Sequence, residues 1–181
     1  MFWRKKSIEE KAKELAPGLV ELARITAPTL WEKLYFQQAK AQPERQSDQT
    51  ASVAMELIYF SFHLLDRECF ARHGEVERNT FMDTMMIEVW KPLLLALPEK
   101  SAAIFGKGII EQANEAQLEY SKYPQLLPEK DQPFGGTLCW EFSKRLVRVY
   151  NPSNISATLP LYFEVAAYII SLYKLINAMK L

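Results

Sequence analysis

Four residues in one segment of the sequence have the types and the spacing to do chemistry together: Glu56, Tyr59, His63 and Arg67. On a helix with about 100° of rotation per residue, Glu56, His63 and Arg67 lie within roughly 40° of one another, and Tyr59 flanks them. Such groups on one face can orient a small molecule by hydrogen bonds, and an imidazole can also act as a general base. These four residues therefore form the candidate ligand-binding site.

The sequence leaves three interpretations of this face open. If it meets solvent, its charges form surface pairs that contribute little to stability. If the helix is buried on all sides, the charged residues must form an internal network or line a ligand pocket. A metal site is the least favoured, because Glu56 and His63 are two helical turns apart and the chain contains no Glu-x-x-His pair. We therefore predict neither a metal nor a cofactor.

Other motifs that carry chemistry are weak or missing. Cys69 and Cys139 form no CxxC motif and no Cys/His pair at zinc spacing, so both are predicted to be small buried hydrophobic residues. There is no G-x-S-x-G and no H-E-x-x-H motif. The loop 134–137 leads into a helix that carries cations, as anion sites do, but its cations begin two turns from the helix start. A plain loop with an N-cap at Thr137 is the favoured interpretation.

The elements that must position these residues are predicted to be helices. Apolar residues recur at helical spacing, and period-two alternation of β-branched residues is absent over any useful length. The fold class is therefore all-α, a single-domain helical bundle of about seven helices over residues 1–181. Helices are expected from Ser7, with a break at Pro17-Gly18 and a restart at Pro28, and over residues 51–73, 79–97, 101–120, 137–150 and 158–181.

The arrangement of these helices is also predicted. The helices over 51–73 and 159–180 should form the centre, and helix 101–120 should lie outside with Glu111, Glu115 and Glu119 as a solvated stripe. Residues 43–50 are polar and are expected to form a loop. The segment 123–136 holds three prolines and two glycines in fourteen residues, and it is either a functional lid or a pinned surface segment.

Charge and hydropathy exclude several classes of function. The 181 residues have a net charge of zero, which disfavours nucleic-acid binding. The basic N-terminus has no apolar stretch behind it, so no secretory signal is predicted and the expected location is cytoplasmic. The apolar stretch 159–179 contains Glu164 and Lys174, which favours a buried helix and no membrane span.

Three functions from different classes remain. The leading one is a soluble interaction or regulatory domain without catalytic chemistry, because catalytic motifs are missing and 22 aromatic residues could form an exposed patch. Its partner would be another protein or a second copy in a homodimer. A stripe of small and polar residues around Ala167 and Ser171 would let another helix approach closely, either inside the domain, which is favoured, or across a dimer interface. The alternative is a small-molecule binding module with an apolar pocket oriented by Glu56, His63 and Arg67. The third is an enzyme with His63 as its general base.

Overall fold

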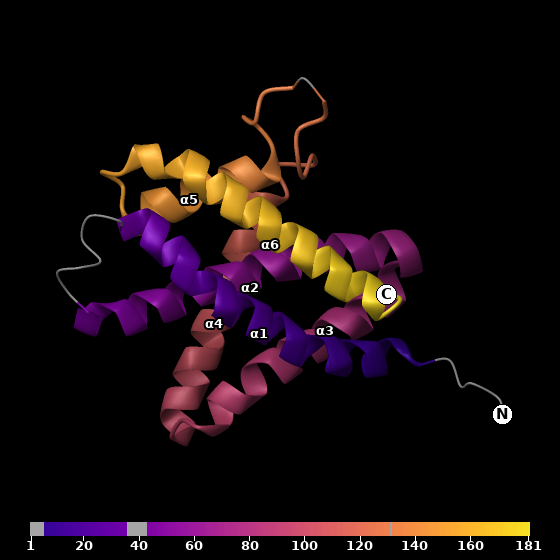
Figure 1. Cartoon of the computed structure of the whole chain (residues 1–181). Helices are drawn as coiled ribbons and strands as arrows, with labels where there is room; N and C mark the ends of the chain where they lie inside the picture. Colours follow the sequence, from indigo (N-terminus) through magenta and orange to yellow (C-terminus); the bar gives the residue numbers. More distant parts are fainter. Residues whose placement is uncertain (1–5, 36–42, 131) are drawn as a thin grey trace.

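The computed structural model describes residues 6–35, 43–130 and 132–181, and in these ranges it contains α-helices and no strand (Figure 1). This confirms the predicted all-α class, with six α-helices where about seven were expected. The α-helices are α1 (Ile8–Tyr35), α2 (Pro43–His73), α3 (Glu75–Leu95), α4 (Glu99–Tyr120), α5 (Leu138–Tyr150) and α6 (Thr158–Ala178), and the 3-10 helix η1 (Ile155–Ala157) precedes α6.

Three helix ends lie where the sequence signals place them. Before α1, the Ser7 amide donates to the Glu10 carboxylate at 2.7 Å and the Glu10 amide donates to Ser7 Oγ at 3.2 Å, which forms a capping box at the predicted helix start. Gly74 follows the last residue of α2 with a φ of 82°, a conformation that favours glycine. Thr137 caps α5, because its hydroxyl oxygen accepts a hydrogen bond from the Trp140 amide. These signals are local, so the sequence alone predicts them.

The predicted break at Pro17-Gly18 and the predicted restart at Pro28 are both wrong, because α1 is one continuous helix that contains both prolines. The two prolines are three turns apart on the exposed side of α1, where water can solvate the carbonyls that proline leaves without a donor. Gly18 instead faces α6: a Cβ at this position would lie 3.1 Å from Leu175 Cδ2. The Pro-Gly pair therefore marks a close approach between two helices and not a turn.

Two further boundaries differ from the prediction. Residues 43–50 are helical and not a loop, because α2 begins at Pro43, and proline is compatible with the first position of a helix. The third helix begins at Glu75, one turn before the predicted start at Asn79, so Gly74 alone separates α2 from α3. The polar character of residues 43–50 reflects a helix end and not an irregular segment.

The core surrounds α2, which packs against α1, α3 and α4. Most residues of α2 from Glu56 to Leu65 are buried, as expected for a central helix. The prediction that α6 forms the centre together with α2 is wrong, because α6 packs mainly against α1 and α5 at one side of the bundle. The second central helix is α1, which packs against α2, α3 and α6. As predicted, α4 lies outside, since only Ile109, Ala116 and Tyr120 of this helix are buried. The predicted solvated stripe is wrong at Glu119, which is half-buried and pairs with Arg145 and Arg148.

By length and composition, the segment Ile155–Ala178 could cross a membrane. Buried core helices of soluble proteins meet the same two criteria, and 44% of its most apolar window is buried inside the bundle. Its charged residues lie at or near the surface: Glu164 pairs with Lys33 of α1 at 3.7 Å, and Lys174 is exposed. The stripe of small residues on α6 lies partly at the surface, because Ala167 is exposed and Ser171 is half-buried.

Candidate functional site

The structure buries three of the four predicted site residues. Glu56 is 8% exposed, Tyr59 is 4% exposed and His63 is 2% exposed, whereas Arg67 lies at the surface. The hydrogen-bond partners of the buried three come from α4 and α5. This segment of α2 is therefore buried on nearly all sides, and its polar side chains must find partners inside the protein.

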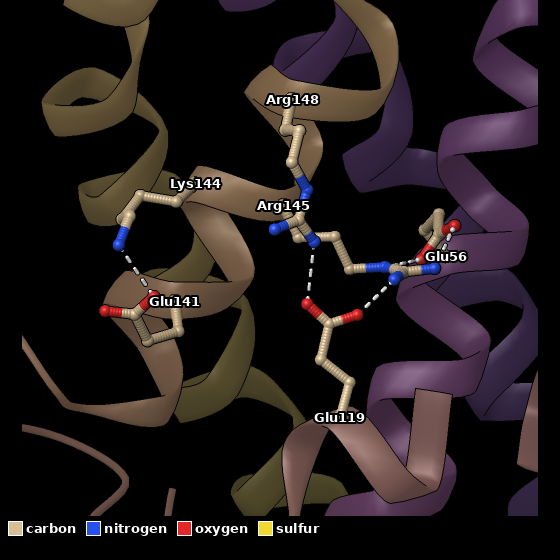
Figure 2. A network of polar contacts seen from close by, with 6 residues as sticks. All are labelled: Glu56, Glu119, Glu141, Lys144, Arg145 and Arg148. Atoms are coloured by element: carbon tan, nitrogen blue, oxygen red, sulfur yellow. Dashed lines mark hydrogen bonds and ion pairs between the residues drawn. The ribbon is translucent and has the colours of Figure 1, made fainter. Parts of the chain in front are cut away.

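Glu56 belongs to a chain of ion pairs that connects α2, α5 and α4 (Figure 2). Arg145 of α5 donates from Nε and Nη2 to the two oxygens of Glu56, at 3.0 and 3.2 Å. Arg145 also donates to Glu119 of α4, and Arg148 Nη2 donates to the other oxygen of Glu119 at 2.8 Å. Two carboxylates and two guanidiniums thus alternate, and the Arg145–Glu56 pair has the two-pronged geometry that makes arginine–carboxylate pairs strong.

In this network, each charged group stabilises the ionised form of its neighbours. Burial would raise the pKa of the Glu119 carboxyl, but hydrogen bonds and charge from Arg148 and Arg145 outweigh it and hold the pKa below its usual value. Burial would lower the pKa of Arg145, but Glu56 outweighs that effect and raises it. The Arg145 guanidinium also lies 6.0 Å from the centre of the Tyr120 ring. These contacts favour a structural role for Glu56, because protein groups already occupy its two oxygens.

His63 lies in a second polar chain. Its Nδ1 is 2.9 Å from Gln117 Oε1, Gln117 Nε2 donates to Asp66 Oδ2 at 3.0 Å, and Asp66 pairs with Arg78. Because Gln117 presents its carbonyl oxygen, Nδ1 carries the proton and donates. The other ring nitrogen, Nε2, is buried and has no hydrogen-bond partner among the described residues. A substrate could reach this imidazole only if the helices around it moved apart.

We expect the protein to lose stability as the pH falls below about 6.5, the ordinary pKa of histidine. Burial lowers the pKa of His63 in the folded state. The unfolded chain therefore binds the proton first, so stability is full above this pH and decreases down to the folded-state pKa. Urea unfolding at about pH 7.5 and about pH 5.5 tests this, with His63→Gln as the comparison.

The wild-type protein should lose more stability than His63→Gln over this range. His73 is present in both proteins, so its own titration cancels in the comparison. The same loss in both proteins would contradict a lowered pKa for His63.

The remaining two predicted site residues also contact the protein itself. Burial raises the pKa of Tyr59 to about 12, and its hydroxyl donates to Gln112 Oε1 at 3.1 Å. Arg67 donates to the backbone carbonyls of Tyr123 and Pro124, at the start of the proline-rich segment. Arg67 therefore anchors this loop, which favours a pinned surface segment over a lid.

The start of α5 has an internal carboxylate where an anion would bind. The Gly136 amide donates to Glu141 Oε1 at 3.4 Å, and Glu141 also pairs with Lys144 at 2.8 Å (Figure 2). Phe134, in the same loop, packs on the rings of Trp140 and Tyr162. These contacts agree with the plain loop and N-cap that the sequence favoured.

The two cysteines are buried, as predicted. Burial raises the pKa of the Cys69 thiol to about 11 and that of Cys139 to about 12, so both thiols stay protonated at neutral pH. Within the described ranges, no group of three or more His, Cys, Asp and Glu side chains could hold a metal ion.

An apolar cleft of about 360 Å³ lies between α3 and α4, where the sequence predicts no site. Phe81, Met85, Val89 and Leu93 recur at helical spacing in α3, and the first three are buried whereas Leu93 is exposed. The cleft lies along the α3 residues next to this buried face. Sequence periodicity shows that residues share a face of a helix, but it does not show which other helix packs there. Residues that line it include Ile87, Trp90, Lys91 and Leu94 of α3 and Gly106 and Ile110 of α4.

Comparisons of the chain with protein-family models, with curated proteins and with solved structures find no match. The structure brings Glu56, Tyr59 and His63 together on a buried face, places Arg67 at the surface and forms a separate apolar cleft.

Proposed function

We propose that this chain is a helical binding domain without catalytic chemistry, and that the α3–α4 cleft is its binding site. The contrast between the polar residues of α2 and the α3–α4 cleft supports the proposal. The polar groups of Glu56 and Tyr59 are hydrogen-bonded to other side chains of the protein. The cleft, in contrast, is apolar and open between two helices. Its volume of about 360 Å³ and its aliphatic and aromatic lining are typical of small-molecule pockets.

Several apolar side chains that line the cleft are also exposed at the surface of the α3–α4 hairpin. Ile87 is 60% exposed and Leu95 is 77% exposed, and Ile104 and Ile110 of α4 are also exposed. Exposed apolar side chains gathered around one cleft are typical of a binding site. The interaction domain expected from the sequence remains a proposal, and a protein partner or a second copy would bind on this same surface.

Two glycines of α4 provide a matched pair of variants that test the site. Gly106 lines the cleft, and a Cβ there would make an ordinary contact with Leu94 Cδ2 at 3.8 Å. A larger side chain at this position would therefore occupy the cleft. Gly108 does not line the cleft, and a Cβ there would meet nothing within 4 Å. The two positions share one helix and differ in their relation to the cleft.

The neutral apolar dye N-phenyl-1-naphthylamine is expected to bind the wild-type protein and the Gly108→Phe variant alike. In Gly106→Phe the dye should bind about tenfold more weakly, because the new ring fills the cleft. Fluorescence titration measures the affinity, and circular dichroism checks that both variants are folded. Equal binding to both folded variants, or no binding to the wild-type protein, would place the function elsewhere.

A further inference from the structure

Resting on the proposed function of the cleft, we infer the class of its ligand: an aliphatic carboxylate, an apolar carbon chain with one anionic end. The lining of the cleft favours the apolar carbon chain of this ligand. Leu94 and Ile109 offer hydrocarbon surface to a flexible chain, and each methylene that leaves water strengthens binding about fourfold. This part alone would suit any aliphatic molecule.

The polar groups at the cleft define the other end of the ligand. Lys91 is the one charged residue among those that line it, and within the described ranges Lys91 is in no ion pair. The nearby Lys107 differs, because Glu111 lies 3.7 Å from it. Trp90, only 5% exposed, also lines the cleft, and its indole nitrogen has no hydrogen-bond partner among the described residues.

The polar group that a ligand in the cleft can meet is therefore the Lys91 ammonium, a donor and a cation, because the indole nitrogen of Trp90 is itself buried. A ligand with a negatively charged acceptor complements Lys91, whereas an ammonium would be repelled by it. A single cation matches a single negative charge, which favours a carboxylate over the more highly charged phosphate monoester. The small volume of the cleft favours a chain of moderate length.

The test compares three molecules with the same carbon chain: decanoate, decanol and protonated decylamine. Each is titrated below its micelle-forming concentration, at neutral pH and low salt, to displace N-phenyl-1-naphthylamine. Decanoate should bind about threefold more tightly than decanol, and decylamine should bind most weakly. The preference should shrink when salt is added, because Lys91 is exposed to solvent.

The Lys91→Glu variant should invert this order, so that decylamine binds most tightly and decanoate most weakly. Lys100→Glu is the matched control, because Lys100 is an exposed lysine of the same hairpin that does not line the cleft. This control should keep the wild-type order.

The outcomes separate the two proposals. If all three molecules displace the dye equally, the carboxylate inference is overturned and the proposed binding site stands. An unchanged order in Lys91→Glu also overturns the inference, because another group would then select the anion. If the dye itself fails to bind the wild-type protein, both proposals fall.

Discussion

Replacing Arg145 with methionine is expected to lower the free energy of unfolding by about 3 kcal/mol. The variant leaves the Glu56 carboxylate, 8% exposed, without the guanidinium that donates to both of its oxygens. It also removes one of the two arginines that contact Glu119. The loss is large because a buried charge without a partner cannot recover its hydration. Urea unfolding measures it.

Arg148→Met is the matched control for this variant. The Arg148 side chain is 67% exposed, and its pair with Glu119 at 2.8 Å should contribute less than about 1 kcal/mol. A double-mutant cycle with Glu56→Gln adds a second check, because the double variant leaves no buried charge unpaired. Its destabilisation should be smaller than the sum of the two single variants. Strict additivity would show that Glu56 and Arg145 do not stabilise each other.

Gly18→Leu is expected to destabilise the protein by about 2 kcal/mol, although leucine has the higher helix propensity. A Cβ at position 18 would already lie 3.1 Å from Leu175 Cδ2, so the rest of the leucine side chain would force α1 and α6 apart. Thermal and urea unfolding measure the effect. The opposite sign is expected for Gly108→Ala, by up to about 1 kcal/mol, because open space surrounds that position.

A second-site variant tests the mechanism of this effect. Leu175→Ala removes the side chain that a residue at position 18 would meet, so the double variant Gly18→Leu/Leu175→Ala should recover part of the stability lost in Gly18→Leu. If Gly18→Leu stabilises the protein as Gly108→Ala does, the packing of α1 on α6 does not require a glycine.

The sequence by itself determined the helical class and several helix ends. Apolar periodicity and the caps at Gly74 and Thr137 are local signals, since each depends on a few neighbouring residues. The sequence also placed Glu56 and His63 on one face of a helix, because helical geometry alone decides which residues share a face. The sequence could not decide whether that face is exposed to solvent or buried.

Only the tertiary structure decided what these residues contact. Arg145 meets Glu56 from 89 positions along the chain, and Gln117 meets His63 from 54 positions, so no local pattern reveals either pair. Pro17-Gly18 was likewise misassigned as a helix break, because Gly18 accommodates Leu175 of a helix that is distant in the sequence. The cleft likewise exists only where α3 lies beside α4 at Gly106, which contributes no side chain. Contacts between distant segments depend on how helices pack, and helix packing is a property of the whole fold.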